Sequence, residues 1–408
     1  MKLPKASWQR REGMKPLLAA LDAEGGATRY VGGCVRDTLL GLPVSDVDLA
    51  TRLPPESVME RLARARIKAV PTGIAHGTVT AVVAGKPVEV TTLRRDVATD
   101  GRRATIAYTD DWRKDAARRD FTINALFADP VTLEVHDYFG GEQDLAARRV
   151  RFIGDPLTRI AEDHLRILRF FRFHARFGAG EPDAEGLDAC TARANDLMAL
   201  SRERIADELL NLLGLDDPAA TVWLMAERGI FAPVLPEVDR HGADRVAFLV
   251  PREKAAEVKP EGIRRLGALL PRDQHCAAAV AARLRLSKAL RARLLCIEHG
   301  GRDAPQDDPL ALAYSVGAEC ATDRLLLEQR LDAAEAAEKI RRLRGWQRPR
   351  LRIGGGDLIA MGLEAGPVVA RTLQAIEREW AQAGFPPEGA AQRAIARRHV
   401  DQALRERQ

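Results

Sequence analysis

The sequence predicts an α+β head followed by a long all-α remainder. Up to about residue 150, short apolar runs alternate with glycine and proline turns, and "GTVTAVVAGKPVEVTTLR" indicates two strands joined by a turn. From about Pro156 onward, segments such as "RIAEDHLRILRFFRFHARFG" show helical periodicity. No repeat of fixed period is visible, so the sequence does not support a solenoid.

Length and composition limit the possible classes of protein. A chain of 408 residues is long enough for two to four domains. Lys and Arg exceed Asp and Glu by five, which favours a polyanionic partner. Five scattered cysteines have no C-x-x-C spacing and are expected to be reduced thiols. No apolar stretch approaches membrane-spanning length, so we expect a cytoplasmic protein with no membrane contact.

The first chemical motif is a glycine turn between a short strand and a helix. Residues 29–31 are predicted to form a strand that ends at Gly32 and Gly33, and a helix is predicted over 35–40. Free backbone N–H groups at a helix start favour anions, and glycines let a phosphate approach the backbone. Arg36 adds a forked cation for phosphate oxygens.

The second motif is a pair of aspartates in "VSDVDLAT", which alternation predicts to be a strand. Asp46 and Asp48 are two residues apart and therefore project from one face of a strand. Oxygen-only ligation of this kind suits Mg²⁺ shared with substrate phosphates. Alone, a D-x-D is more often a solvated acidic turn and a Gly-Gly more often an ordinary one. Together they indicate a metal–triphosphate site.

These motifs resemble the polymerase-beta-type nucleotidyltransferases, and more narrowly the class of tRNA CCA-adding enzymes and bacterial poly(A) polymerases. The pattern G-G-x-V-R-D, a spacer and D-x-D is matched in residues 32–48. "RRDFTINA" (118–125) resembles the second motif and "EDHLRILRFFRF" (162–173) the fourth. The resemblance is strong over about the first 250 residues and weaker in "GGGDLIAMGLEAGPVVARTL". It implies a catalytic head over 1–145, a helical neck over 146–205, a helical body over 206–340 and an RNA-contacting helical tail over 341–408.

A third carboxylate is expected beside the aspartate pair, to hold the metal that activates the attacking hydroxyl. Glu89 lies on a predicted neighbouring strand, and the family carries an acidic residue in a similar place. Asp120 is the competitor, although the resemblance suggests that it organises Arg118 or Arg119, or meets the ribose. Arg119 is itself carried over as a nucleotide-binding residue. An exposed strand residue is the ordinary alternative for Glu89.

Residues 159–173 are predicted to form one amphipathic helix, on which Asp163 and Arg166 are neighbours and Glu162 supports Arg166. An ionised Asp only accepts hydrogen bonds, whereas Arg only donates them. Cytosine and adenine both present an amino group beside a ring nitrogen acceptor, so one Asp–Arg pair can select both. The resemblance implies that Asp163 and Arg166 do so, and that Arg169 and Arg172 contact other parts of the nucleotide. A helix with ordinary ion pairs is the alternative.

Two further segments have functional interpretations that composition alone leaves open. The charged segment "RRDVATDGRRATIAYTDDWRKDAA" is predicted to be a mobile loop. A loop in this place is needed for the final A in CCA-adding enzymes, although an ordinary surface loop fits equally well. "EKIRRLRGWQRPRLR" surrounds Trp346 with arginines, which suits an RNA backbone. A solvated helix end is its alternative.

The resemblance implies a Mg²⁺-dependent, template-independent enzyme that adds CCA to the 3′ end of tRNA from CTP and ATP and releases pyrophosphate. An A-adding enzyme or a poly(A) polymerase of the same family is the nearest alternative. However, "PTGIAHGTVTAV" stands where poly(A) polymerases typically carry G-R-R-F. A non-catalytic RNA-binding protein with a decayed site is the alternative from another class.

Overall fold

The structure is a computed structural model that describes residues 1–100, 103–298, 308–386 and 389–405. The chain forms two compact units, of which the first is Met1–Glu208 with Glu227–Val234 and the second is Leu209–Ala226 with Leu235–Gln408. The break at 208 lies near the predicted end of the neck at 205, and the division into four domains stays a prediction. No helix within the described ranges combines the length and the hydropathy needed to cross a bilayer.

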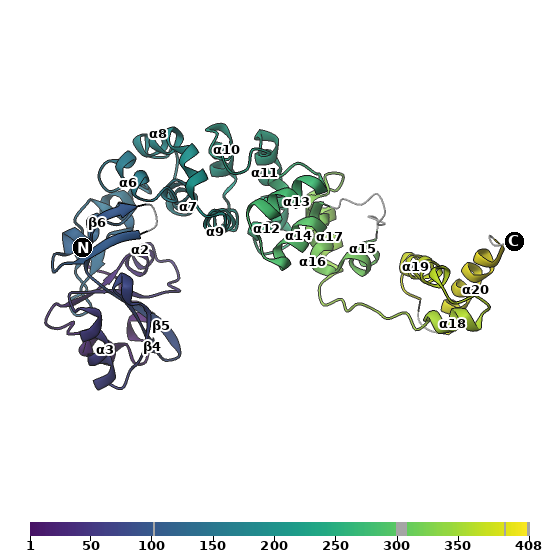
Figure 1. Cartoon of the computed structure of the whole chain (residues 1–408), viewed down its shortest axis with the longest axis horizontal. Coiled ribbons are helices and arrows are strands. Elements are labelled where there is room, and N and C mark those ends of the chain that lie inside the picture. Colours follow the sequence, from purple (N-terminus) through teal and green to yellow (C-terminus); the bar gives the residue numbers. More distant parts are fainter. Residues whose placement is uncertain (101–102, 299–307, 387–388, 406–408) are drawn as a thin grey trace. The chain divides into compact units, whose positions relative to one another are not determined.

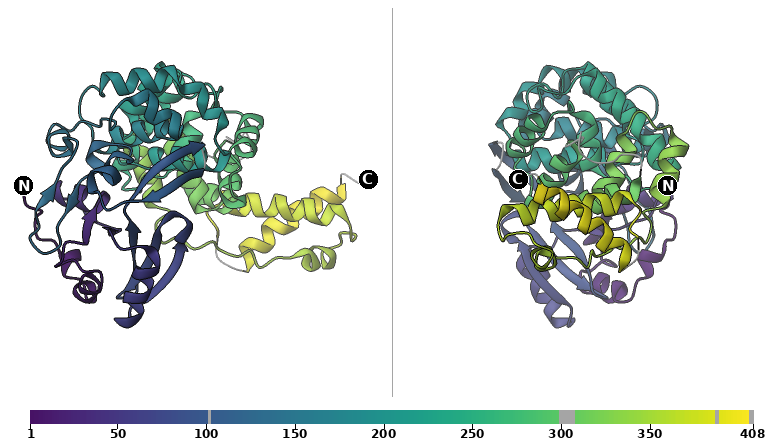
Figure 2. Two further views of the ribbon diagram at one scale, coloured as in Figure 1. Left: turned by 60° about the vertical axis from the view of Figure 1, so that its left-hand side comes forward. Right: turned by 90° about the vertical axis from the view of Figure 1, so that its right-hand side faces the viewer.

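The first unit is built on a seven-stranded sheet in the order β3-β4-β5-β2-β1-β8-β9. β2 and β5 are parallel, and the other neighbours are antiparallel. The hairpin of β4 and β5 projects at the lower side of the left panel of Figure 2. The strands are β1 (Thr28–Val31), β2 (Asp48–Thr51), β3 (Lys68–Gly73), β4 (Thr78–Val83), β5 (Lys86–Thr92), β8 (Phe127–Ala128) and β9 (Val135–His136).

The register of this sheet separates its two faces. Tyr30 lies directly opposite Leu49, and Asp48 lies directly opposite Glu89. Because side chains alternate along a strand, Tyr30 and Leu49 project from one face, and Asp48 and Glu89 project from the other. Tyr30 and Leu49 are buried, so their face is covered by the core at this point.

The charged segment after β5 is not a loop in the described residues, and that prediction is wrong for most of its length. β6 (Arg94–Asp100) and β7 (Arg103–Tyr108) form a two-stranded antiparallel hairpin, and α4 (Trp112–Ala117) follows. Gly101 and Arg102, at the predicted centre of the loop, lie outside the described residues. The alternating pattern of both arms favours strands, and the many charges obscured it.

The first unit also contains helices, of which α6, α7 and α8 lie above the sheet in the view of Figure 1. The aromatic side chains of α7 (Arg166–Phe177) pack against two segments. Phe170 stacks on Phe152, which follows α5 (Gly141–Ala146), at 5.5 Å, and Phe173 lies 5.2 Å from Phe121, which follows α4. These contacts join α7 to Phe121 and Phe152, which pair with each other in an isolated β-bridge. The helices are η1 (Ser7–Arg10), α1 (Met14–Ala20), α2 (Gly33–Leu39), α3 (Pro55–Arg64), η2 (Ile74–His76), η3 (Thr122–Asn124), α5 (Gly141–Ala146), α6 (Pro156–Glu162), α7 (Arg166–Phe177), α8 (Ala184–Ala192), η4 (Ala194–Ala199) and α9 (Arg202–Leu213).

The second unit contains helices and connecting segments, and no strand among its described residues. Buried ion pairs join its helices: Arg265 contacts Glu253 at 2.7 Å, and Arg264 contacts Asp323 at 2.6 Å. The helices are α10 (Ala219–Glu227), α11 (Arg240–Ala255), α12 (Gly262–Leu269), α13 (Gln274–Arg283), α14 (Lys288–Glu298), α15 (Pro309–Val316), α16 (Ala318–Leu327), α17 (Ala333–Arg341), α18 (Gly355–Ala360), α19 (Pro367–Gln382) and α20 (Ala390–Arg405).

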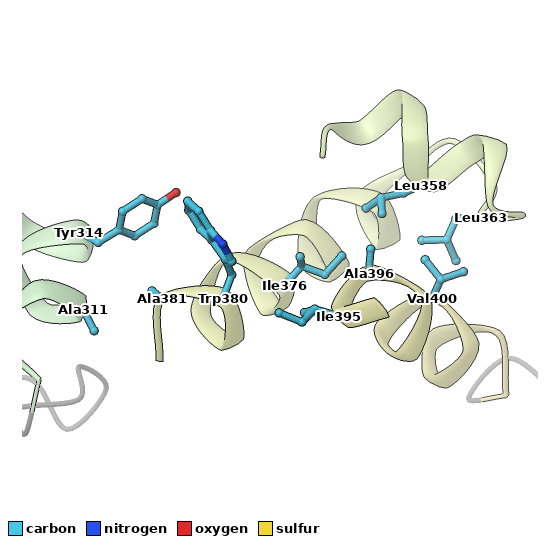
Figure 3. Close-up of a cluster of buried hydrophobic side chains, with 10 residues drawn as sticks. All are labelled: Ala311, Tyr314, Leu358, Leu363, Ile376, Trp380, Ala381, Ile395, Ala396 and Val400. Atoms are coloured by element: carbon cyan, nitrogen blue, oxygen red, sulfur yellow. The ribbon is translucent and has the colours of Figure 1, made fainter. Parts of the chain in front are cut away.

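The last three helices have a hydrophobic cluster of their own, shared with α15 (Figure 3). Tyr314 of α15 meets Trp380 of α19 edge to face at 5.7 Å. Leu358, Leu363 and Val400 gather at the other end of the cluster. α19 and α20 lie side by side (Figure 2). This cluster therefore packs the predicted tail against α15 of the predicted body.

Two cysteines correct the expectation of five reduced thiols. Cys296 at the end of α14 and Cys320 in α16 form a disulfide across a sequence separation of 24. Their spacing has no recognisable motif, so only the packing of α14 against α16 reveals the pairing. Cys34 and Cys190 are free and buried, and Cys276 is free and partly exposed.

Candidate functional site

The glycine turn forms where the sequence predicts it. Gly32 follows β1 with φ +69°, a conformation that favours glycine, and α2 begins at Gly33. A Cβ at position 32 would lie 3.3 Å from a guanidinium nitrogen of Arg119. Gly32 is therefore required both for the backbone turn and for the close approach of Arg119.

Asp48 and Glu89 lie side by side on the parallel strands β2 and β5. The predicted strand over 44–51 begins only at Asp48, so Asp46 lies just before it and is exposed. The backbone nevertheless continues the ladder for one residue, because the Val47 carbonyl accepts a hydrogen bond from the Glu89 N–H at 3.3 Å. With Val47 buried between them, both aspartates stay on one side of the chain.

The electrostatics of this cluster favour a bound cation. Burial, followed by the charge of Glu89, raises the pKa of Asp48 to about 6, while Arg119 acts to lower it. No three carboxylate, imidazole or thiol groups in the described part of the chain enclose a metal ion by themselves. An all-oxygen set of this kind fits an ion that takes its remaining ligands from water and substrate phosphates, as Mg²⁺ does.

Arg119 lies close to the Gly32 turn and acts electrostatically on Asp48. Its guanidinium contacts Asp115 at 3.2 Å, and its buried Nε has no hydrogen-bond partner. Asp115 also accepts from Arg118 Nε at 2.8 Å and from the Arg94 backbone at 3.2 Å. Although burial acts to raise it, the pKa of Asp115 is lowered by Arg119 and Arg118. Asp115 was missed in the sequence, although its spacing of three and four residues from the two arginines is a helical ion-pair signal.

The Arg36 side chain is too buried for easy contact with a phosphate. It is 5 % exposed, and its Nε donates to Asp37 at 2.7 Å. The guanidinium also hydrogen-bonds Asn124 and lies 4.0 Å from the centre of the Phe177 ring. These contacts hold α2 against η3 and α7. A direct contact between Arg36 and a phosphate stays a prediction.

Asp120 is engaged elsewhere in the unit. It is 9 % exposed and accepts from Arg169 Nε at 2.8 Å, from the Asn124 amide at 2.9 Å and from the Phe121 N–H. Burial acts to raise its pKa, but Arg169 and these donors lower it. Asp115, and not Asp120, forms the ion pairs with Arg118 and Arg119. The ribose contact suggested for Asp120 stays a prediction. The geometry favours Glu89 over Asp120 as the third carboxylate.

The predicted base-selecting helix is broken at Asp163. α6 ends at Glu162, Asp163 has extended backbone angles, and α7 begins at Arg166. The Asp163 carboxylate accepts from the Leu165 N–H at 3.2 Å and from Arg204 of α9 at 2.7 Å. Asp163 therefore lies in an extended turn between two separate helices, and the prediction of a single helix over 159–173 is wrong.

The arginines of α7 form a row in which each contacts a carboxylate from another segment. Arg166 contacts Glu162, as expected, and its guanidinium also donates to the Arg159 carbonyl at 2.8 Å. The pairs further along the row are Arg169–Asp120, Arg172–Glu208 and Arg176–Asp37. The row therefore connects α7 to α2, α6, α9 and the segment after α4. A direct role of these arginines in nucleotide binding stays a prediction.

The predicted RNA-contacting segment near Trp346 lies in the second unit. Trp346 packs against the hydrophobic cluster of the last helices, and Arg348 lies 4.5 Å from the centre of the Tyr314 ring. Arg342 and Arg344 form ion pairs with Asp308 and Glu257, both at 2.8 Å. Part of this segment is thus structural, and its RNA contacts stay a prediction.

Comparisons with known proteins match both units. Residues 28–151 match the family described as "Poly A polymerase head domain", and residues 181–241 match "Probable RNA and SrmB- binding site of polymerase A". The mitochondrial CCA tRNA nucleotidyltransferase 1 of Mus musculus is 32% identical over 401 residues, covering 94% of this chain and 90% of that protein. The human protein of the same name is 31% identical over 411 residues, covering 95% and 91%.

Solved structures are similar over almost the whole chain. The Bacillus stearothermophilus CCA-adding enzyme in complex with CTP has a TM-score of 0.75 and 27% identity, covering 96% of this chain and 98% of that one. The Thermotoga maritima CCA-adding enzyme complexed with tRNA has a TM-score of 0.66 at 19% identity, covering 97% and 95%. The second likeness concerns the fold alone.

Proposed function

The chain belongs to the family of CCA tRNA nucleotidyltransferases, and we propose that it adds CCA to the 3′ end of tRNA from CTP and ATP, releasing pyrophosphate. The observation that carries the proposal is the pairing of Asp48 with Glu89 across β2 and β5, beside the exposed Asp46. A non-catalytic RNA-binding protein would not need the mutually repelling carboxylates of Asp48 and Glu89 on adjacent strands. The likeness to a CTP complex at 27% identity supports the same reaction.

Mg²⁺ is the metal that this donor set fits best. Asp46, Asp48 and Glu89 would hold it through carboxylate oxygens, and its charge would offset the repulsion that contributes to the raised pKa of Asp48. When bound, the ion supplies a Lewis acid for the α-phosphate and lowers the pKa of the attacking 3′-hydroxyl. The choice of Mg²⁺ over other divalent ions belongs to the proposal.

The chain's own cations would orient the triphosphate. Arg119 approaches the Gly32 turn and acts on Asp48 electrostatically, so a phosphate between the turn and the carboxylates would meet its guanidinium. Its buried Nε has no acceptor within the protein. Asp115 keeps the guanidinium oriented through its contact at 3.2 Å. Arg119 is therefore a better candidate for the phosphate contact than the buried Arg36.

Asp163 and Arg166 would select the base, as the resemblance implies. Two donors already contact the Asp163 carboxylate, but a carboxylate has about four lone-pair sites and can also accept from a base amino group. Guanine and uracil would present a carbonyl there and be repelled. Arg204 then acts as a positioning residue for Asp163.

A cytoplasmic location stays a prediction, because the relatives named above include mitochondrial proteins.

The test is to size the products made from a tRNA that ends at its discriminator base. With CTP, ATP and Mg²⁺ the product should grow by three nucleotides and then stop, and with CTP alone by two. Growth only on a tRNA that already ends in CC would indicate the A-adding alternative. A long ladder of A would indicate a poly(A) polymerase. Tight tRNA binding without any growth would indicate the non-catalytic alternative.

A further inference from the structure

A cavity lies in the first unit, on the face of the sheet opposite to the carboxylates. It has a volume of about 570 Å³ and is bounded by residues from η1, α1, β1 and the turn over 130–133. Tyr30 of β1 lines it and projects from the face opposite to Asp48, as the register of β1 and β2 requires. The cavity is therefore separate from the proposed metal–triphosphate site.

The cavity is strongly basic. Lys5, Arg10, Arg11 and Lys15 line it, and Glu24 is its single acidic residue. Within the described ranges, none of these four cations has a carboxylate close enough for an ion pair. The Nε and one terminal nitrogen of Arg11 are buried without any hydrogen-bond acceptor. The guanidinium thus has donors that the protein itself does not use. Cations that line a cavity without ion-pair partners favour an anionic ligand.

The remaining wall is apolar. Leu18, Pro130 and Leu133 line the cavity, and Val131 beside them is 59% exposed. Asp129 holds this turn in place by accepting from the N–H groups of residues 131 and 132 at 2.8 and 2.7 Å. An apolar wall beside cations suits a ligand with an uncharged body and a charged end. The volume is within the range of about 300–1,000 Å³ that is usual for small-molecule sites.

From this combination we propose that the cavity binds a nucleoside phosphate, with the phosphates toward Arg11 and Lys15 and the nucleoside against the turn over 130–133. An RNA backbone is the less suitable occupant, because it would lie across an open surface and leave the apolar hollow unfilled. Side-chain contacts also link the cavity wall to α2, the helix that follows the glycine turn. Trp8 of η1 packs on Tyr30 at 4.7 Å and donates to Thr38 of α2 at 3.0 Å.

The test measures ADP binding to the full chain by calorimetry, in EDTA and in an Asp46→Asn/Asp48→Asn background that removes the metal site. Adding Arg11→Glu and Lys15→Glu should weaken ADP binding at least tenfold. The matched control adds Lys68→Glu and Lys86→Glu, which change the net charge equally at exposed positions of β3 and β5. The control should change the affinity less than twofold.

A second variant keeps the test valid if the charge reversals disturb folding. Ala19→Trp places an indole at the wall of the cavity without a charge change and should produce the same loss of ADP binding. Unchanged ADP affinity in both variants, or an equal loss in the control, would overturn the proposal. Inorganic pyrophosphate should bind more weakly than ADP, and equal affinities would refute the nucleoside assignment. Loss of tRNA affinity with ADP binding intact would assign the cavity to RNA instead.

Discussion

Replacing Glu89 and Asp120 separately should give opposite effects on stability and on catalysis. Asp120→Ala removes the partner of Arg169 and leaves the Asn124 amide without its acceptor. Breaking a fully buried pair costs about 3–5 kcal/mol. The Arg169 side chain is 30% exposed, so water offsets part of that loss and we expect about 2–3 kcal/mol. For a unit of this size, the melting temperature should fall by roughly 5–10 °C.

Glu89→Gln should instead leave the protein folded and stable but impair catalysis. It removes a like charge directly beside Asp48, so the apo protein should become more stable by up to about 1 kcal/mol. Addition to tRNA should nevertheless fall by at least about a hundredfold, because a metal ligand is lost. The assay compares thermal melting followed by near-UV circular dichroism with initial rates of CTP incorporation. A stable but inactive Asp120→Ala together with an active Glu89→Gln would reverse the assignment and refute the reasoning.

Three further predictions concern separate parts of the chain. Asp163→Ala should raise UTP or GTP incorporation relative to CTP by about ten- to a hundredfold, because a charged hydrogen bond of roughly 1.5–3 kcal/mol is lost. Competition assays with paired nucleotides measure this ratio, and unchanged selectivity would show that Asp163 has a purely structural role. Shortening the hairpin between residues 97 and 109 should leave C addition intact and stall the product before the final A, and a normal rate of CCA completion on a gel would contradict this. Burial raises the pKa of Glu298 in α14 from 4.5 to about 8, so the native state binds this proton more tightly than the unfolded state does. The free energy of unfolding of the second unit should therefore fall as the pH rises from about 4.5 to 8. The slope should be at most about 1.4 kcal/mol per pH unit. Urea unfolding of Glu298→Gln should lack this slope, and parallel slopes in both proteins would refute the assignment.

Local patterns predicted the parts of the site that lie close together in sequence. The Gly32 turn needs only a strand end and a helix start. Strand alternation placed Asp48 correctly, whereas Asp46 lies just before the strand. The alternation in "PVEVTTLR" also placed Glu89 on a neighbouring strand. The dipeptide Asp100-Gly101 between two alternating runs was a hairpin signal of the same local kind, and the charges around it concealed it.

Contacts between distant segments could not be predicted in this way. Arg169 and Asp120 are 49 residues apart, and the pairing depends on how α7 packs against the sheet. The break at Asp163 has no glycine or proline, so periodicity alone continued the helix through it. The ion pair between Asp163 and Arg204, which are 41 residues apart, depends on the tertiary structure.

The most direct test of the central claim is the Asp48→Asn variant, assayed for nucleotide addition and for tRNA affinity in the same preparation. Metal ligation is lost, whereas the RNA is held mainly by basic surface at a distance from this residue. We therefore expect CTP and ATP incorporation to fall below detection while the Kd for tRNA changes less than about threefold. Near-normal incorporation by Asp48→Asn would contradict the assignment of the carboxylate site.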